Sequence, residues 1–395
     1  MKKVISLGII FLSISTVFSQ VIDPYLLKEI PLGENSVNYF IIHENFLIYN
    51  IKDQLVILDL KSFNENKISV RSKNAGDFNT IIKEFKIIAP KTIAVVNNEP
   101  YALIYNFGKN TYTELPYNLE SNIKINNNFW FSISQNIQNI SFSNTGKYIL
   151  EKRFLETFLL GFIPTENHFE YHLLSYPSLK ELILFSTQDD LEESLNFSPK
   201  DNFLILTNYY NPIDNKNDDF YGVILIDLKN MKAIPLFKDE KIISYDISKN
   251  DDLLAVSFEK NITKVIDLKT LSEVFSYPMG GNVKFTEKSD FLIIEGTRIS
   301  TLIDIKTKEV INTYLGNNLY LSPNEEFLAY TTINNPFSLV KEIQLIYRRS
   351  GIQKKIKLKS EYFLEHMKFS KDEKFLILLL SGKDGYNIKI YKIQE

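Results

Sequence analysis

The sequence predicts an all-β fold, a single β-propeller of four-stranded antiparallel blades, and three observations lead to this prediction. The chain of 395 residues contains 29 Phe and 22 Tyr, which favour strands, against only 14 Gly. One pattern of about ten residues recurs along the chain at intervals that are typical of repeat proteins. Further apolar segments follow each copy, so each repeat holds four strands, innermost to outermost, as a propeller blade does.

The recurring pattern is a short strand that ends in Phe-Ser or a related pair, then a polar turn and a solid apolar run. Two clear copies are Asn196 to Leu206 and Lys368 to Leu378. The turn is rich in Pro, Asn, Asp and Gly, which tolerate its dihedral angles or bond their own backbone. The apolar run lacks alternating polarity, which predicts a second strand buried on both faces. The Ser or Thr of the six copies stands at positions 143, 198, 248, 286, 322 and 370, at intervals of 55, 50, 38, 36 and 48 residues.

A third and a fourth strand are expected after each copy of this pattern. Val223 to Leu228 is a third strand, and the more polar Lys232 to Leu236 is a fourth. Weaker repeats of four strands lie upstream, at Asn38 to Val70 and at Lys83 to Pro116. The count is eight blades, with seven as the alternative because Tyr117 to Gln138 fits the repeat poorly.

The two ends of the repeat region are expected to meet. Ile388 to Ile393 is a third strand with no fourth strand after it, while Lys28 to Leu32 resembles the fourth strand at Lys232 to Leu236. We therefore expect the N- and C-terminal strands to share one blade. Such a blade closes the ring and leaves no open sheet edge.

The first 19 residues are typical of a signal peptide. Lys2 and Lys3 precede an apolar run from Val4 to Phe18, and Ser19 completes a small-residue cleavage pattern with Gln20 as the first mature residue. The alternative is an uncleaved anchor, but about 15 apolar residues fall short of the roughly 20 that a helix needs to cross a bilayer. We expect residues 1–19 to be removed and residues 20–395 to form the propeller of a periplasmic or secreted protein.

Composition excludes several classes of protein. The chain has no cysteine, which excludes disulfides, a thiol nucleophile and a cysteine-based zinc site. Its formal net charge is −3, and losing Lys2 and Lys3 makes it −5, whereas a nucleic-acid binder usually carries a basic excess. The basic cluster from Arg348 to Lys359 includes Lys355 and Lys357, which alternate with apolar residues as on the wet face of an outer strand. We expect no nucleic-acid partner and no transmembrane segment after cleavage.

Over residues 36–395 the pattern resembles the WD40-like propeller repeats of the TolB and YVTN type found in exported bacterial proteins. The best matches are Phe197-Ser198-Pro199, Leu321-Ser322-Pro323 and the Ile-Asp pairs 226–227, 266–267 and 303–304, where that family often has Trp-Asp. The Gly-His pair of eukaryotic WD40 repeats is missing. The resemblance implies a propeller, and it implies no particular function.

The loops between second and third strands are long in the third, fourth and seventh repeats, and such insertions often mark the working face of a repeat protein. They run from Glu151 to Phe169, from Asn208 to Phe220 and from Thr332 to Lys341. In the first, apolar residues at helical spacing predict a short helix. It either docks a partner or folds onto the disc as a lid, and we favour the lid because soluble proteins seldom expose large apolar patches.

The same insertions supply the candidate partner-binding residues. Aromatic residues flank a polar loop in the fourth repeat, and interface chemistry and ordinary blade packing explain them equally well. The candidates are Phe154, Phe158, Phe162, Tyr209, Tyr210, Phe220, Tyr221 and Phe337.

Two groups of residues have the composition of metal ligands. Glu166, His168, Glu170 and His172 share one face of a strand, but a solvated outer face explains that spacing without a metal. Asp214 to Asp219 resembles an oxygen-rich calcium loop, but Lys216 occupies a ligand position and no Gly follows at the turn. We expect no metal and no cofactor.

Catalytic motifs are missing: there is no Gly-x-Ser-x-Gly, no phosphate-binding glycine loop and no His-Glu-x-x-His. We therefore expect a non-enzymatic exported propeller that binds another protein or an envelope component, as a monomer or in a hetero-complex. The alternative is an exported hydrolase, lyase or lactonase with its site in the axial channel. Two buried carboxylates or histidines within hydrogen-bond reach there would favour the enzyme, and an apolar or Asn- and Tyr-lined rim would favour binding.

Overall fold

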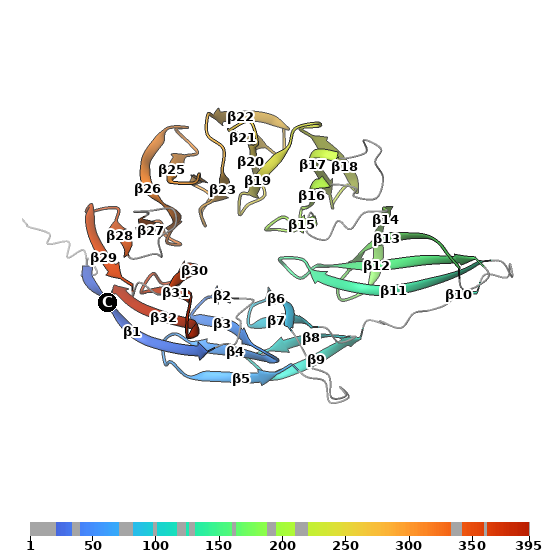
Figure 1. Cartoon of the computed structure of the whole chain (residues 1–395), viewed down its shortest axis with the longest axis horizontal. Coiled ribbons are helices and arrows are strands. Elements are labelled where there is room, and N and C mark those ends of the chain that lie inside the picture. Colours follow the sequence, from blue (N-terminus) through green and yellow to red (C-terminus); the bar gives the residue numbers. More distant parts are fainter. Residues whose placement is uncertain are drawn as a thin grey trace, which may run out of the picture.

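The strands of this chain form antiparallel sheets arranged around a common centre (Figure 1). A computed structural model describes residues 21–33, 40–70, 82–97, 101–116, 124–125, 131–159, 163–187, 195–209, 220–332, 342–358 and 362–394. These ranges contain no helix with the length and apolarity that crossing a membrane requires. The signal peptide predicted at residues 1–19 lies outside them.

Four sheets have four strands in simple meander order. The first consists of β2 (Phe40–His43), β3 (Phe46–Ile51), β4 (Gln54–Asp59) and β5 (Glu65–Ser69). The second consists of β6 (Ile82–Ala89), β7 (Thr92–Asn97), β8 (Tyr101–Asn106) and β9 (Thr111–Pro116). The third consists of β15 (Leu195–Phe197), β16 (Phe203–Tyr209), β17 (Phe220–Asp227) and β18 (Lys232–Leu236). The fourth consists of β19 (Ile242–Ile247), β20 (Leu253–Phe258), β21 (Ile262–Asp267) and β22 (Ser272–Tyr277).

A seven-stranded sheet divides into two halves at its long middle strand. It consists of β23 (Asn282–Phe285), β24 (Phe291–Glu295), β25 (Ile299–Asp304), β26 (Val310–Leu321), β27 (Phe327–Thr332), β28 (Glu342–Tyr347) and β29 (Ile352–Lys357). Residues 310–315 of β26 pair with β25, and residues 316–321 pair with β27. One continuous strand is therefore the fourth strand of one unit and the first strand of the next.

The N-terminal strand pairs with the last strand of the chain. β1 (Val21–Gly33) lies antiparallel to β32 (Gly385–Gln394), and the sheet continues through β31 (Phe375–Gly382) to β30 (Phe363–Phe369). Ile30 pairs with Ile388, so the segment Lys28 to Leu32 takes the place of a fourth strand, as its resemblance to Lys232 to Leu236 predicts.

The remaining sheet projects beyond the others (Figure 1) and corrects one expectation. It consists of β10 (Lys124–Ile125), β11 (Phe131–Phe142), β12 (Tyr148–Leu159), β13 (Ile163–Ser175) and β14 (Lys180–Thr187). The helix expected around Phe154 and Phe158 is wrong, because this segment is the outer half of β12. Backbone pairing with β11 and β13 along its whole length outweighs the helical spacing of its apolar residues.

The burial of successive strands follows the order expected of each repeat. Four consecutive residues of β3 and of β4 are buried, whereas β5 is almost wholly exposed. Among the described residues, buried apolar side chains form eight clusters, and each cluster joins two neighbouring units. One of them joins the β1–β30–β31–β32 sheet to the β2–β5 sheet through Ile388, Ile390, Leu47 and Val56. The abundant aromatic and aliphatic side chains of the chain thus pack between neighbouring sheets.

The recurring Ser or Thr has the same structural role in all six copies. Its hydroxyl oxygen accepts a hydrogen bond from the backbone N–H five residues later, as in Phe203 N to Ser198 Oγ at 3.0 Å. The other five are Tyr148 to Ser143, Leu253 to Ser248, Phe291 to Thr286, Phe327 to Ser322 and Phe375 to Ser370, at 2.8 to 3.2 Å. This bond closes the turn between the first and second strands.

Candidate functional site

A polar position recurs in the first strands, two residues before the Ser or Thr of each repeat. We call the six residues there the channel belt; they are Ser141, Asn196, Asp246, Lys284, Tyr320 and Lys368. They lie on β11, β15, β19, β23, β26 and β30, respectively. Several contact the next unit: Asn196 donates to Tyr245 Oη at 2.9 Å, and Lys368 donates to the Phe40 carbonyl at 3.3 Å. A polar belt therefore runs around the inner strands.

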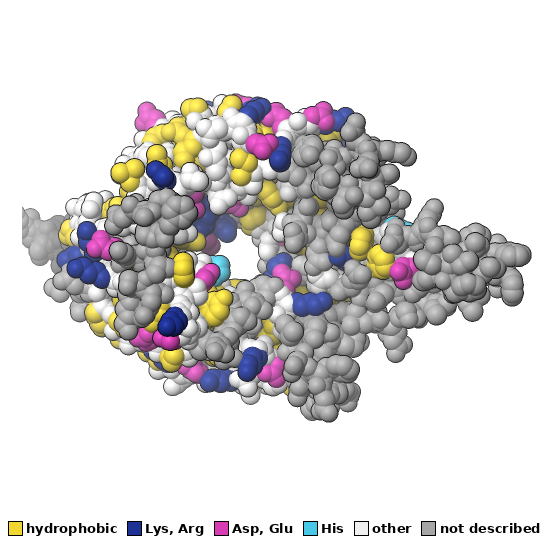
Figure 2. Space-filling view, viewed as in Figure 1, with side chains coloured by type: hydrophobic (Ala, Val, Ile, Leu, Met, Phe, Trp, Pro, Cys, Tyr) yellow, Lys and Arg dark blue, Asp and Glu magenta, His cyan; other side chains and the backbone are white. Residues whose placement is uncertain are grey.

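Four belt residues, Asp246, Lys284, Tyr320 and Lys368, line a cavity of about 660 Å³, which we call the axial pocket. Its walls come from β2, β19, β23, β24, β26 and β30 and from the turns that follow the first strands. Figure 2 shows an opening through the middle of the molecule with charged side chains of both signs and histidine at its edge. This volume lies within the range of small-molecule sites.

The two carboxylates inside the axial pocket are held by backbone N–H groups. Asp246 accepts from Phe285 N at 2.7 Å and from Ile247 N at 2.9 Å, so both of its oxygens are engaged. Glu295 accepts from Leu319 N at 2.6 Å. Burial raises the pKa of both carboxyl groups, although these hydrogen bonds act in the opposite direction. Each carboxylate thus bonds to backbone, and no hydrogen bond between the two is seen in the described part of the chain.

The two lysines inside the pocket are less well satisfied. The ammonium of Lys284 lies 3.6 Å from the centroid of the Tyr320 ring. No carboxylate of the described residues lies within ion-pair distance of it. Burial lowers its pKa to about 8, while Glu295 and Asp246 attract the charged form. Burial likewise lowers the pKa of Lys368, whose ammonium donates to the Phe40 carbonyl and to no other acceptor of the described residues.

Two histidines lie on first strands in this region, one of them in the wall of the pocket. His43 on β2 lines the pocket, and its Nε2 is buried with no hydrogen-bond partner among the described residues. The ring of His366 on β30 stacks on Phe40 with centroids 6.3 Å apart. Burial lowers the pKa of both histidines. At neutral pH their rings are neutral, so the positive charge of the pocket comes from lysine.

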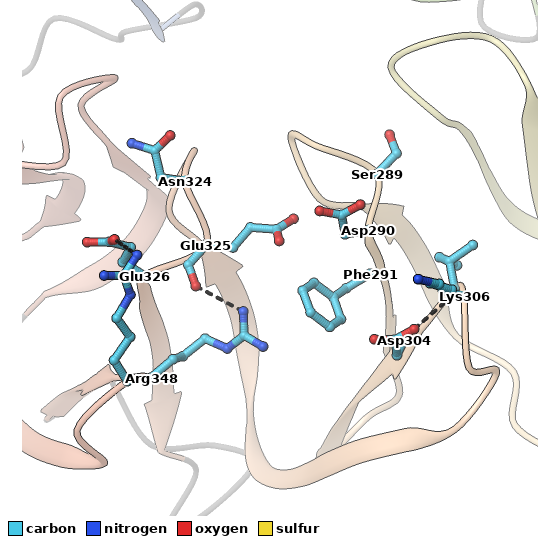
Figure 3. Close-up of a pocket in the computed structure, with 11 residues that line it drawn as sticks. Ser289, Asp290, Phe291, Asp304, Lys306, Asn324, Glu325, Glu326 and Arg348 are labelled. Atoms are coloured by element: carbon cyan, nitrogen blue, oxygen red, sulfur yellow. Dashed lines mark hydrogen bonds and ion pairs between the residues drawn. The ribbon is translucent and has the colours of Figure 1, made fainter.

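A second cavity of about 690 Å³ lies between the two halves of the seven-stranded sheet (Figure 3). The guanidinium of Arg348 lies 4.5 Å from the centroid of the Phe291 ring and donates to the Glu325 carbonyl at 2.9 Å. Arg349 pairs with Glu326. Because these charged groups already pair within the groove, we place the candidate site in the axial pocket instead.

The predicted partner-binding residues lie away from this pocket. Phe154 is half-buried on β12, and its ring centroid lies 5.2 Å from that of Phe169. Phe158 is on the same strand. Tyr209 and Phe220 are cross-strand partners at the ends of β16 and β17, and Tyr221 follows Phe220 on β17. Phe162, Tyr210 and Phe337 lie outside the described residues, as does the loop from Asp214 to Asp219.

The acidic and histidine-rich face of β13 differs from expectation at one residue. The interpretation as a solvated outer face is wrong at His172, whose side chain is only 5% exposed. Its Nδ1 lies 2.8 Å from Glu181 Oε2 on β14, and its Nε2 lies 3.1 Å from Glu170 Oε2. Throughout the described ranges no group of three or more His, Asp or Glu side chains is arranged to hold a metal ion.

The basic cluster lies where the alternating pattern places it. Lys355 and Lys357 of β29 are exposed, whereas Ile356 between them is buried. Lys355 pairs with Glu342 on the neighbouring strand at 3.3 Å. This is the wet face of an outer strand, as predicted.

Comparison with known proteins supports the fold alone. No protein-family model and no curated protein matches the sequence. The β-propeller domain of Cps50 (Swd1) from Myceliophteria thermophila is 13% identical, with a TM-score of 0.48 and coverage of 94% of this chain and 99% of that one. Dihydro-heme d1 dehydrogenase NirN, solved in complex with DHE, is 14% identical, with a TM-score of 0.55 and coverage of 94% and 75%. Together with the all-β sheets described above, the likeness to NirN supports a β-propeller fold.

Proposed function

We propose that this chain is an exported, non-enzymatic β-propeller that serves as a binding scaffold for another protein or an envelope component. We further propose that its axial pocket is a ligand-binding site of that scaffold. The single observation that carries the proposal is the pocket itself, where charged groups from several inner strands face one cavity of small-molecule size. The hydrogen bonds of Asp246 and Glu295 favour binding over acid–base catalysis, since backbone N–H groups engage both oxygens of Asp246 and one oxygen of Glu295.

We infer that the scaffold has eight blades in a closed ring of the WD40-like type. Counting β26 in both halves of the seven-stranded sheet gives eight units among the described strands. The pairing of β1 with β32 and the apolar cluster between that sheet and the β2–β5 sheet support closure. A closed ring keeps the inner strands in place without a disulfide, and this rigidity suits a preformed pocket.

Blocking the pocket tests whether it is the binding site. Asn282 is exposed on β23 and lines the pocket, so Asn282→Trp places a large ring in it. Asn312→Trp on β26 is the matched control, because Asn312 is equally exposed but does not line the pocket. The protein is incubated with a small-molecule extract, and the retained compounds are identified by mass spectrometry. We expect the wild type and the control to retain a compound that Asn282→Trp loses; equal retention by all three would contradict the proposal.

One observation favours the enzymatic alternative, an exported hydrolase, lyase or lactonase. A lysine whose pKa is lowered to about 8 is partly neutral near physiological pH, and a neutral amine can act as a nucleophile or a base. The same experiment separates the two functions. Binding returns the retained compound with unchanged mass, whereas catalysis returns a product whose formation is lost in Lys284→Met.

The projecting hairpin of β12 and β13 is the surface we propose for a protein partner. Phe154, beside Phe169, and Phe158 lie on its outer part, and aromatic side chains are enriched at interfaces. The double variant Phe154→Ala and Phe158→Ala is compared with the wild type in a pull-down from an envelope extract. Loss of a specific partner is expected, and equal recovery of every partner would exclude the hairpin as a docking site.

Export is tested on the full chain. Expressed in a bacterium, the protein is expected to accumulate outside the cytoplasm with Gln20 as its first residue, which N-terminal sequencing determines. Retention of Met1 or a cytoplasmic location would contradict this part of the proposal.

A further inference from the structure

We propose that the axial pocket binds a small organic molecule carrying at least two oxyanion groups, carboxylates or phosphates, through Lys284 and Lys368. This inference rests on the proposed function, since it names the class of ligand for the same site. It is argued from the hydrogen-bonding capacity of the pocket, from its aromatic walls and from the electrostatic relationship between its lysines.

The two lysines inside the pocket have N–H donors without a hydrogen-bond acceptor among the described residues. An ammonium group offers three N–H donors. That of Lys284 contacts only the face of the Tyr320 ring, and that of Lys368 makes one bond, to the Phe40 carbonyl, among the described residues. Of the carboxylates, Asp246 has both oxygens engaged by backbone N–H groups and Glu295 has one. The ammonium groups of Lys284 and Lys368 therefore offer N–H donors that no acceptor of the described residues takes up, which favours a ligand with acceptor oxygens.

The charges at the mouth of the pocket do not reverse this preference. Lys249 pairs there with Glu287 at 3.9 Å, and both residues follow first strands. Lys371 and Glu44 also line the pocket and carry opposite charges. The rim is balanced, and inside the pocket Asp246 and Glu295 equal the two lysines in number. The preference for an anion therefore comes from the unused N–H groups of Lys284 and Lys368 and not from net charge.

In the absence of a ligand, the positive charges of the lysines that line the pocket repel one another. After burial, the negative charges of Glu295 and Asp246 raise the pKa of Lys284, and the positive charges of Lys368 and Lys249 lower it. Lys249 also lowers the pKa of Lys368, while Glu287 raises it. An oxyanion beside each of these lysines would offset this repulsion and replace part of the hydration that both groups have lost. Two lysines from non-adjacent units, β23 and β30, suit two separate anionic groups on one molecule.

The walls of the pocket indicate an organic body between those groups. Tyr245, Tyr320, Ile42 and Leu321 line it and are half-buried. The lining residues Val283, Ile293 and Phe369 are buried in the clusters between units. Aromatic and aliphatic side chains stabilise an apolar ligand surface, which a bare inorganic ion lacks. We therefore expect an organic dianion to bind more tightly than pyrophosphate does.

Calorimetric titration of the full chain tests the proposal with three anionic probes: 2,6-naphthalenedicarboxylate, citrate and pyrophosphate. The neutral analogue 2,6-naphthalenedimethanol is titrated in parallel. We expect the naphthalenedicarboxylate to bind and the neutral analogue not to bind. Lys284→Met and Lys368→Met should each weaken binding about tenfold to a hundredfold, as expected for a lost hydrogen bond to a charged group. Lys284→Arg should retain most of the affinity, and Lys232→Met, at an exposed site on β18, should change nothing.

A proton signature separates binding at Lys284 from adsorption elsewhere. Near pH 8 the free amine is partly deprotonated, and an oxyanion beside it raises its pKa, so binding takes up protons. Titrations in buffers of different ionisation enthalpy measure this uptake, which Lys284→Met should abolish. The groups that face Lys284 and share in the titration are Asp246, Glu295, Tyr320, Lys249 and Lys368.

The outcomes distinguish this inference from the proposed function. If none of the three anions binds the folded wild type, or if the lysine variants bind them equally well, the inference is wrong. The blocking experiment can then still show a neutral compound that the wild type and Lys284→Met retain and Asn282→Trp loses. In that case the axial pocket is a ligand-binding site, as proposed, but not one for anions. If the blocking experiment shows no compound that depends on the open pocket, both fail.

Discussion

Ser143 donates a hydrogen bond from Oγ to Asp201 Oδ2 at 2.6 Å, and this bond joins the turn of one sheet to the turn of the next. Asp201 also accepts from Asn144 N and Thr145 N, both at 2.9 Å. The relationship recurs one unit further on, where Ser198 donates to Asp251 at 2.7 Å, and again where Thr286 donates to Glu325 at 2.7 Å. A buried acid three residues after the recurring Ser or Thr therefore connects neighbouring turns.

Asp201→Asn should destabilise the protein by about 2–4 kcal/mol, because it leaves buried donors around residue 201 without a charged acceptor. Asp201 is only 3% exposed. Asp252→Asn is the matched control, since Asp252 is exposed and its carboxylate bonds to the exposed Asn250 side chain; it should change stability by about 0.5 kcal/mol or less. Urea unfolding of the three proteins measures the difference. Equal midpoints would show that this contact between sheets does not contribute to stability.

Gly146 occupies the position that an acid fills in other repeats, and Gly146→Ala should destabilise the protein by about 2–4 kcal/mol. Its φ is +71°, and a Cβ there would lie 2.5 Å from Ile88 Cβ and 2.8 Å from the Ile88 carbonyl oxygen. Gly351→Ala measures the backbone strain alone. The φ of Gly351 is also positive, at +68°, but no atom lies within 4 Å of the added Cβ. This substitution should cost only about 1 kcal/mol. A loss in Gly351→Ala as large as that in Gly146→Ala would contradict the role of Ile88.

Lys284→Met should stabilise the ligand-free protein at pH 7 by about 1–3 kcal/mol, because it removes a charge that the fold holds away from water. The folded-state pKa of Lys284 is about 8, below the ordinary lysine value of 10.5. A lowered pKa contributes stability that is fully present above the ordinary value and is lost as pH falls through the folded value. The advantage of Lys284→Met should therefore be constant below pH 8 and shrink as pH rises toward 10.5. Denaturant unfolding across this range, with Lys232→Met as control, measures the trend; an advantage that grew with pH would contradict the account.

Deleting residues 1–33 should leave β32 as an unpaired edge and reduce stability. The deletion removes Ile30 and Leu32, which are buried against Ile388, Ile390 and the β2–β5 sheet. An exposed apolar edge strand also promotes self-association, which size-exclusion chromatography detects. A truncated protein that stayed monomeric and as stable as the mature chain would argue against a ring closed by these strands.

Much of the fold could be predicted because each repeat carries its own local information. The Ser or Thr at the turn, the apolar second strand and the polar fourth strand recur with enough fidelity to place most strands. The Ile-Asp pairs also acquire a role: Asp267 Oδ1 accepts from Lys269 N at 2.9 Å and Thr270 N at 2.8 Å, which caps the turn to the fourth strand. These hydrogen bonds lower the pKa of Asp267, and the bond from Thr270 N has the largest effect.

The features that the sequence did not predict correctly also have physical reasons. The residues around Phe154 have helical spacing, but long-range pairing with β11 and β13 decides their conformation, and no local pattern reports such pairing. A site in the axial channel was considered only for the enzymatic alternative, and the residues of the axial pocket were not predicted because they are far apart in sequence. A signal was present. Asp246, Lys284 and Lys368 share one position of the repeat, two residues before its Ser or Thr, on the first strand of each unit.

The most direct test of the central claim, that the axial pocket is a ligand site, is a crystal structure with an anion bound. Crystals of the wild type and of Lys284→Met are soaked in a tri-iodinated benzenedicarboxylate, and the iodine atoms are located by anomalous scattering. We expect iodine density in the axial pocket of the wild type, with the carboxylates facing Lys284 and Lys368, and an empty pocket in Lys284→Met. Density confined to the outer surface, or identical density in both crystals, would contradict it.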